Sequence, residues 1–308
     1  MSRIAIIEIY PLKKMNRSHY QDAHLRNSIL LSKILGADLL CVESDFVRAL
    51  QREYSVLILS YGALYAPFKL IEKLFEKNAK SRKYWITNEY NLTPIGSIKK
   101  YDHGIIANFE KQPYKKNVTS FHVINLNLLL SRAPNPFIDK NYDCVYYGTF
   151  RVGRKLYFNR YLQDDIFLST SEKNFKRFAY AGCEARWIRK LVWTEGRETL
   201  NRFRYSLYLE DEFTHTCYNF LANRYYEAGF CNNVVFFDEN CRATVEKSEL
   251  ARFDTELYFV RDYSDLQDRI KTCNENFEKY LAIQKTWRVS EPILRQLEID
   301  KLIKIIYG

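Results

Sequence analysis

Residues 143–155 have the sequence Asp-Cys-Val-Tyr-Tyr-Gly-Thr-Phe-Arg-Val-Gly-Arg-Lys. An apolar strand here leads into a turn at Gly148, and basic residues then open a helix. The turn after such a strand favours an anion, because backbone N–H groups and the helix dipole meet there. Arg151, Arg154 and Lys155 add charged donors that suit phosphate. A basic helix cap on the surface is the alternative interpretation.

The same alternation of strand and helix extends over the whole chain and indicates parallel sheets covered on both faces. In the first half we expect strands at Ile4–Ile9, Asp38–Val42, Val56–Ser60, Tyr84–Thr87, Gly104–Asn108 and His122–Leu126, and helices near Tyr20–Leu35 and Phe68–Lys77. In the second half we expect strands at Cys144–Tyr147, Ile166–Ser169, Lys190–Trp193, Tyr205–Leu209, Val234–Phe237 and Leu257–Val260. The helices there are expected near Arg154–Tyr161, Glu172–Tyr180, Tyr218–Gly229, Ser264–Asn276 and Val289–Ile306.

A break between the two halves contains two prolines, in Ser-Arg-Ala-Pro-Asn-Pro at residues 131–136. Such a segment is typical of an interdomain linker. We therefore predict two tandem doubly wound α/β domains, residues 1–135 joined by a C-terminal helix at 290–308, and residues 136–289. Ligands of such domains bind outside the carboxyl ends of the strands, which predicts a cleft between the two.

The net charge of +10 is concentrated in the first half. Residues 1–140 hold 21 Lys and Arg against 12 Asp and Glu, whereas residues 141–308 hold 26 against 25. This asymmetry favours a polyanion partner for the first half, nucleic acid ahead of a membrane surface. A solvated lysine-rich surface is the simpler alternative. The DNA-binding candidates are Lys99, Lys100, Lys111, Lys115 and Lys116, and a further basic cluster is Lys80, Arg82 and Lys83.

Composition excludes several classes of protein. Hydrophobic residues make up 47% of the 308 residues and charged residues 27%, as in folded globular proteins. No apolar run is long enough for a transmembrane helix, and no secretion signal opens the chain. Seven cysteines without a Cys-x-x-Cys pair indicate reduced thiols in a cytoplasm and argue against a zinc site. The histidines have no metal-ligand spacing.

A second motif, Arg224-Tyr-Tyr-Glu227, precedes the apolar strand at 233–237 and the pair Asp238-Glu239. Arg224 and Glu227 are three residues apart and so share one face of a helix. The arginine suits a phosphate and the carboxylate suits the two hydroxyls of a ribose. A local surface ion pair is the alternative.

Together the two motifs resemble those of the phage DNA glucosyltransferases, enzymes of the GT-B fold. The resemblance implies that Thr149, Phe150, Arg151 and Lys155 surround the nucleotide diphosphate. It also implies that Arg224 binds phosphate and Glu227 the ribose. Lys155 stands where the family has an arginine, so a bidentate phosphate contact is lost there.

The resemblance places the catalytic base directly after the strand that ends at Thr87. Asn88 stands at the position of the family's aspartate and cannot accept a proton. Either Glu89 takes over this role, or His24 and Asp22 on the first helix do.

The expected function is inverting transfer of a sugar from a UDP-sugar to a 5-hydroxymethylated pyrimidine of DNA, which the enzyme flips out. A Mg²⁺ or Mn²⁺ ion on the diphosphate is the cofactor to expect, although no Asp-x-Asp motif provides a dedicated metal site. We expect a cytoplasmic monomer with no membrane partner, acting in restriction evasion by a phage. The alternatives are a GT-B enzyme acting on a glycan or lipid-linked acceptor and an inactive DNA-binding relative.

Overall fold

The computed structural model describes residues 3–8, 28–60, 68–87, 104–107, 118–120, 138–191, 198–217, 221–289 and 291–308. The chain forms two compact units, one of Met1–Leu130 with Arg295–Gly308 and the other of Ser131–Leu294. Each unit contains a six-stranded sheet, and every strand pair among the described residues is parallel. The predicted α/β class with two tandem parallel-sheet units is confirmed.

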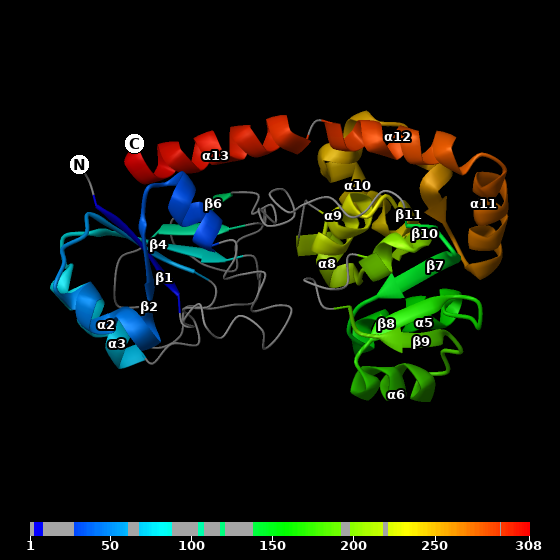
Figure 1. The fold of residues 1–308 in the computed structure, drawn as a ribbon, viewed down its shortest axis with the longest axis horizontal. Coiled ribbons are helices and arrows are strands. Elements are labelled where there is room, and N and C mark those ends of the chain that lie inside the picture. Colours follow the sequence, from blue (N-terminus) through cyan, green and yellow to red (C-terminus); the bar gives the residue numbers. More distant parts are fainter. Residues whose placement is uncertain are drawn as a thin grey trace. The chain divides into compact units, whose positions relative to one another are not determined.

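The first unit has the strand order β2-β1-β3-β4-β5-β6. Its strands are β1 (Ile4–Glu8), β2 (Asp38–Cys41), β3 (Val56–Leu59), β4 (Arg82–Thr87), β5 (Gly104–Ala107) and β6 (Val118–Ser120). Its helices are a segment at residues 28–34, α2 (Val42–Leu50), α3 (Phe68–Lys77) and α13 (Glu291–Tyr307), which begins in the second unit. Figure 1 shows α2 and α3 on one face of this sheet and α13 over the other.

Alternation along β1 explains why both faces of the first sheet are covered. Ala5 and Ile7 contribute to the core cluster under α2 and α3, whereas Ile4 and Ile6 contribute to the cluster that includes α13. Successive side chains of a strand point to opposite faces, so an uninterrupted apolar strand requires helices on both. The helix at residues 28–34 ends just before Gly36, whose φ of 57° is a conformation that glycine adopts without strain.

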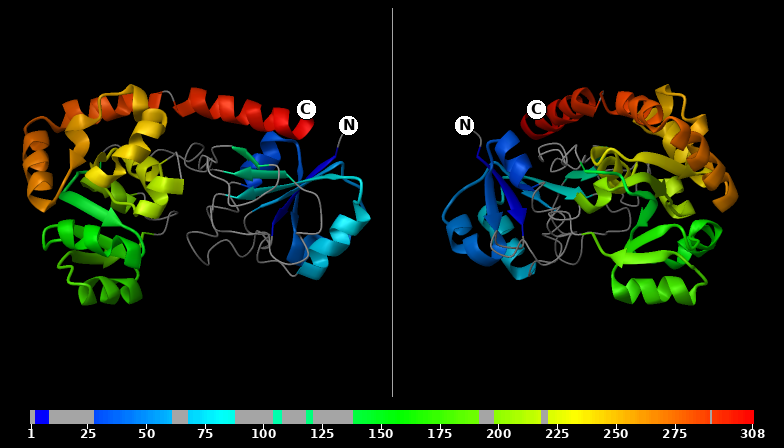
Figure 2. Two further views of the ribbon diagram at one scale, coloured as in Figure 1. Left: turned by 180° about the vertical axis from the view of Figure 1, so that it is seen from behind. Right: turned by 45° about the vertical axis from the view of Figure 1, so that its right-hand side comes forward.

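The second unit has the strand order β12-β11-β10-β7-β8-β9. Its strands are β7 (Tyr142–Tyr147), β8 (Phe167–Thr170), β9 (Arg186–Arg189), β10 (Phe203–Tyr208), β11 (Val234–Asp238) and β12 (Phe259–Val260). Its helices are α5 (Lys155–Tyr161), α6 (Glu172–Tyr180), α8 (Glu212–Cys217), α9 (Asn223–Phe230), α10 (Arg242–Lys247), α11 (Tyr263–Glu275) and α12 (Phe277–Val289). Short 3₁₀ turns lie at Val152–Arg154, Glu239–Cys241, Glu249–Arg252 and Glu256–Tyr258. Figure 2 shows these elements from two further directions.

Aromatic side chains fill much of this second core. The ring of Phe158 lies 5.6 Å from that of Tyr146 and 4.7 Å from that of Phe178, between centroids, which places α5 and α6 over one face of β7. Val145 faces the other way, into a cluster with Phe203. Because β7 is covered on both sides, its carboxyl end is held rigidly.

The predicted edge strand of the second sheet differs from the structure. The edge strand of the second sheet is β9, whereas Lys190 and Leu191 of the predicted strand Lys190–Trp193 lie beyond its end and are not in a strand. The sequence Arg-Trp-Ile-Arg of β9 is charged because the strand lies at the sheet edge, and the more apolar residues after it were a misleading signal. The predicted strand His122–Leu126 lies outside the described residues. The described strand β6 ends at Ser120, just before it.

Six of the seven cysteines are buried, namely Cys41, Cys144, Cys183, Cys231, Cys241 and Cys273. Across the residues with described structure, no helix has the length and apolar character that a bilayer-spanning segment requires.

Candidate functional site

The two motifs meet at the centre of the second sheet. The strand order places β7 and β10 side by side, although β8 and β9 follow β7 in the chain and lie on its other side. Between such strands the successive connections turn to opposite faces, which makes this the topological switch point of the sheet, where ligands of doubly wound folds bind. Gly148 follows β7 at this point, and Glu210 and Asp211 follow β10 shortly after its end.

Gly148 of the first motif lies against Arg224 of the second. A Cβ atom added to Gly148 would lie 3.7 Å from Nη2 of Arg224 and 3.1 Å from the hydroxyl of Tyr146. A glycine, which has no Cβ, avoids the tight contact with the Tyr146 hydroxyl. Two segments that are 76 positions apart in the sequence are therefore joined in one local site.

Arg224 lies near the start of α9, and its guanidinium extends over the ends of β7 and β10. Nη1 donates to the hydroxyl of Tyr146 at 3.1 Å and to the carbonyl of Leu209 at 3.0 Å. Nη2 lies 3.3 Å from Oε1 of Glu210. Although burial disfavours the charged form, Glu210 and the neighbouring tyrosines raise the pKa of Arg224 well above its usual range. The side chain stays 16% exposed, so this cation is held in place while one edge remains accessible.

Arg154 has a different role from the phosphate donor that its position in the sequence suggested. Its guanidinium forms a close ion pair with Glu210 and a hydrogen bond of 3.0 Å to Asp211. Its side chain is only 3% exposed. Arg154 is therefore a structural cation that holds both acidic residues, and the 3₁₀ turn containing it precedes α5.

Glu210 and Asp211 were missed by the sequence argument. The signal that could have found them is their position directly after the predicted strand Tyr205–Leu209, where polar side chains of a parallel sheet gather. Burial raises the pKa of Asp211, but the Arg154 guanidinium and hydrogen bonds from Thr214 outweigh it, and the pKa of Asp211 falls below its usual value. Asp211 is therefore an anionic partner of the buried Arg154, and Glu210 lies in ion-pair contact with both Arg154 and Arg224.

Glu227 lies one turn after Arg224 in α9 and is 7% exposed. It faces the hydroxyl of Tyr147, which donates to the backbone carbonyl of Arg224 at 2.5 Å. Burial, and then the charge of Glu227, raise the pKa of Tyr147 well above its usual value. The second motif therefore contacts β7 through both of its charged residues.

The remaining residues of the first motif divide into an anchor and an exposed set. Phe150 packs edge-on against Phe178 at 5.2 Å between ring centroids, which fixes the turn onto α6. Thr149, Arg151 and Lys155 are exposed. Neither cation forms an ion pair among the residues with described structure, so both are available to an anion.

The other predicted site residues lie outside the described residues. They are Glu89, His24 and Asp22 as catalytic candidates, and Lys99, Lys100, Lys111, Lys115 and Lys116 as DNA-binding candidates. In the described basic cluster, Lys83 is buried and donates to the carbonyls of Asn78, Ala79 and Ser81, and Arg82 donates to the carbonyl of Ile306. These two cations have structural roles.

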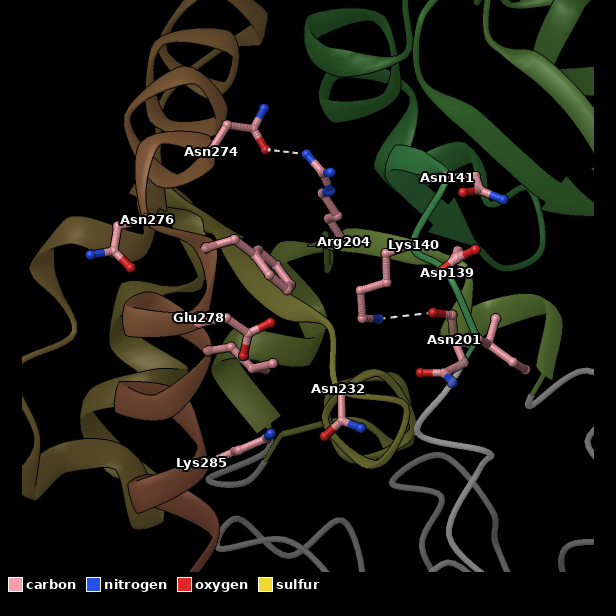
Figure 3. Close-up of a pocket in the computed structure, with 13 residues that line it drawn as sticks. Asp139, Lys140, Asn141, Asn201, Arg204, Asn232, Asn274, Asn276, Glu278 and Lys285 are labelled. Atoms are coloured by element: carbon pink, nitrogen blue, oxygen red, sulfur yellow. Dashed lines mark hydrogen bonds between the residues drawn. The ribbon is translucent and has the colours of Figure 1, made fainter.

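A cavity of about 720 Å³ lies at the opposite, amino edge of the second sheet. Figure 3 shows Lys140 inside it, where Nζ donates to the carbonyl of Asn201 at 2.8 Å, and Arg204, which donates to Asn274 at 3.0 Å. Burial lowers the pKa of Lys140 to about 8. Because doubly wound folds bind ligands at the carboxyl edge, this cavity is not the nucleotide site.

No protein-family model matches the chain, and no curated protein matches it by sequence. Solved structures do match over the full length. A DNA-modifying β-glucosyltransferase, determined with and without its substrate uridine diphosphoglucose, superposes with a TM-score of 0.75 at 16% identity, over 99% of this chain and 100% of that chain. The T4 phage β-glucosyltransferase in complex with UDP and Mn²⁺ gives 0.69 at 16% identity, over 99% of each chain.

An α-glucosyltransferase in complex with UDP and a 13-mer DNA containing a central A:G mismatch gives a TM-score of 0.69 at 12% identity, over 100% of each chain. The resemblance to phage DNA glucosyltransferases that the motifs indicated is thus confirmed for the fold, which is GT-B.

Proposed function

We propose that the protein is an inverting glycosyltransferase that moves a sugar from a UDP-sugar, glucose in the first instance, to a 5-hydroxymethylated pyrimidine in DNA. The observation that carries this proposal is the approach of Gly148 to Arg224 at the switch point of the second sheet. It joins the two sequence motifs into one anion site on a GT-B fold. Likeness to enzymes solved with UDP-glucose and with DNA supports the choice of substrates.

In this proposal the second of the two domains predicted from the sequence, residues 136–289, binds the donor. Arg224 presents Nη2 beside the Gly148 turn and binds the diphosphate, together with Arg151 and Lys155. Glu227 accepts hydrogen bonds from the ribose hydroxyls. Charged donors held in a partly buried place stabilise the negative charge that develops on the leaving UDP.

The reaction forms one bond and breaks one. The hydroxyl oxygen of the hydroxymethyl group attacks the anomeric carbon from the face opposite the leaving group. The bond from that carbon to the diphosphate oxygen breaks, and UDP leaves with the electron pair. The hydroxyl proton passes to a base of the first unit. Glu89 is one candidate for the base, and His24 with Asp22 is the other.

The acceptor DNA binds to the first predicted domain, residues 1–135 with the helix at 290–308. Lys99, Lys100, Lys111, Lys115 and Lys116 contact its phosphates, and the target base is flipped out of the duplex, because a stacked base cannot present its hydroxymethyl group to the donor. We propose a cytoplasmic monomer that acts on phage DNA and serves restriction evasion.

The sequence predicts a Mg²⁺ or Mn²⁺ ion on the diphosphate. Among the described residues, no group of three or more His, Cys, Asp and Glu side chains could hold a metal ion. Glu210 and Asp211, which follow β10, are engaged by Arg154. These residues do not fit a dedicated metal site, and no step is assigned to a metal.

The experiment is incubation of the protein with hydroxymethylated duplex DNA and a panel of nucleotide sugars, followed by mass analysis of the nucleosides. We expect a hexosylated nucleoside with a UDP-sugar, lost in Arg224→Ala and retained in Arg202→Ala, an exposed arginine of the same unit. Transfer only to a glycan or lipid-linked acceptor would contradict the DNA assignment. Binding of DNA and UDP without transfer by the native protein would identify an inactive relative.

A further inference from the structure

The second unit has a basic surface, although the basic and acidic residues of this half of the chain nearly balance. Residues 171–190 contain six Lys and Arg against two Glu. The rest of residues 141–308 then has 20 basic against 23 acidic residues, so the positive charge of this half is gathered in one place. These residues form α6 and β9, at the outer edge of the second sheet (Figure 1).

Helix α6 has one face that packs and one that is exposed. Phe175 and Phe178 point inward, and Phe178 is buried. Lys173, Lys176, Arg177 and Tyr180 are spaced as positions i, i+3, i+4 and i+7, which places them along one stripe, and all four are exposed. Tyr180 is 96% exposed at the end of this stripe.

Strand β9 extends the same surface. The ring of Trp187 stacks on Phe175 of α6 with 5.7 Å between centroids, so Trp187 lies on the side of the sheet that α6 covers. Arg189 points to the same side, because it is two residues further along the strand. Trp187 is 42% exposed, and Arg189 and Lys190 are exposed. We call Lys173, Lys176, Arg177, Tyr180, Trp187, Arg189 and Lys190 the α6–β9 face.

Most cations of this face are available to a partner. Lys176 pairs with Glu172 at 3.0 Å, an exposed i,i+4 pair that contributes little. Within the described ranges, Lys173, Arg177 and Arg189 form no ion pair. Charges on an edge strand alone would only keep other strands away, but they do not explain a fully exposed tyrosine at the end of a cationic stripe. Cations interleaved with exposed aromatic rings are the arrangement that nucleic acids bind.

The α6–β9 face also adjoins the candidate donor site. The guanidinium of Arg177 lies 5.1 Å from the centroid of the Phe150 ring, and Phe150 belongs to the turn that carries Gly148 and Arg151. A polyanion lying along α6 therefore reaches the turn where the sugar is transferred.

We infer that the α6–β9 face is a second DNA-binding surface, which holds the strand next to the target base from the donor side. The cations contact phosphates and Tyr180 stacks on an unpaired base. This inference rests on the proposed function and adds to it, because charge balance alone assigned DNA to the first half of the chain.

The test is DNA affinity as a function of salt for the full chain, with hydroxymethylated duplex DNA as the probe. Lys173→Ala with Lys176→Ala should weaken binding roughly tenfold at low salt. Each lost phosphate contact should reduce the slope of log affinity against log salt by about 0.9. Tyr180→Ala should weaken binding with the slope unchanged, and Tyr180→Phe should restore it. UDP affinity should stay at the native value in all of them, since Arg177 is left intact.

The matched control is Lys271→Ala with Lys279→Ala, which removes two exposed lysines from α11 and α12 of the same unit. An unchanged slope in the α6 variant, or an equal loss in the control, would overturn the inference while leaving the proposed function intact. A native protein that binds no DNA would overturn both. Loss of binding to anionic vesicles in the α6 variant, with DNA binding unchanged, would assign the face to a membrane surface instead.

Discussion

Nη2 of Arg224 lies 3.3 Å from Oε1 of Glu210, and the carboxylate of Glu210 is itself only 2% exposed. The other oxygen of Glu210 is bound by Arg154. Oε1 accepts no hydrogen bond within the described part of the chain, so its contact with Arg224 is an ion pair without a hydrogen bond. Glu210 thus gives Arg224 a counter-charge while leaving the donors of Nη2 to a ligand.

This relationship predicts that Glu210→Gln binds UDP more tightly than the native protein. The substitution keeps the shape of the side chain but removes a negative charge that repels the diphosphate. At an effective dielectric constant of about 20, two like charges roughly 10 Å apart repel each other by about 1.7 kcal/mol, so removing one of them corresponds to roughly a tenfold lower Kd. Arg154 keeps its hydrogen bond to Asp211 in the variant.

Calorimetry with UDP measures the effect. Glu278→Gln, at the opposite edge of the same sheet, changes the net charge equally and should leave the Kd unchanged. A folded Glu210→Gln variant with native or weaker UDP affinity would show that Glu210 only supports the fold.

A second prediction concerns the Gly148 turn. Gly148→Ala places a methyl group 3.1 Å from the Tyr146 hydroxyl and 3.7 Å from Nη2 of Arg224. The Tyr146 hydroxyl has to shift by a few tenths of an ångström, whereas the distance to Arg224 is an ordinary contact. We expect the methyl group to obstruct the approach of the diphosphate. We expect UDP affinity to fall roughly tenfold or more, in line with a lost hydrogen bond to a charged group of about 1.5–3 kcal/mol.

Gly153→Ala is the matched control from the same motif. Its added Cβ would meet nothing closer than the Cβ of Asp211 at 3.8 Å, an ordinary contact. Titration of both variants with UDP measures the two affinities, and we expect only the Gly148→Ala variant to bind UDP more weakly than the native protein. Equal affinities would remove the Gly148 turn from the donor site.

The sequence predicted best those elements whose local signals agree with their surroundings. Helix α6 begins at Glu172 and ends at Tyr180 as predicted, because Ser171 caps it and one face is apolar. Strand β9 was misplaced because an edge strand carries charges that resemble a loop. The residue types of the site were recognisable, but the pairing of Arg154 with Glu210 was not. It depends on two strand ends meeting across 56 positions of sequence, which no local pattern records.

A third prediction uses the pH dependence of stability. His215 is 8% exposed, its Nδ1 lies 2.7 Å from the hydroxyl of Thr244, and burial lowers its pKa below the usual 6.5. The unfolded chain therefore binds a proton at a higher pH than the folded protein does. The stability that depends on neutral His215 is therefore fully present above pH 6.5, and it is lost as the pH falls from 6.5 through the lower pKa of the folded state.

Urea unfolding at pH 7.5 and at pH 5 measures this loss. In His215→Gln the free energy of unfolding should change less between the two pH values than in the native protein, even though the variant is less stable at pH 7.5. An equal change in both proteins would place the acid sensitivity in other groups.

The last prediction concerns the catalytic base. The structure ends β4 at Thr87, and this carboxyl end lies in a parallel sheet, where acceptor-binding residues are expected. Asn88 and Glu89 follow it outside the described residues. Removing the true base should lower turnover at least ~100-fold, as typical general-base contributions do, while the Kd for the donor stays unchanged. We expect this of Glu89→Gln, with Asn88→Ala as the adjacent control, since an amide takes no proton. If Glu89→Gln keeps native turnover while His24→Ala or Asp22→Asn loses it, the base belongs to the first helix. If all three variants turn over normally, the acceptor hydroxyl is activated elsewhere.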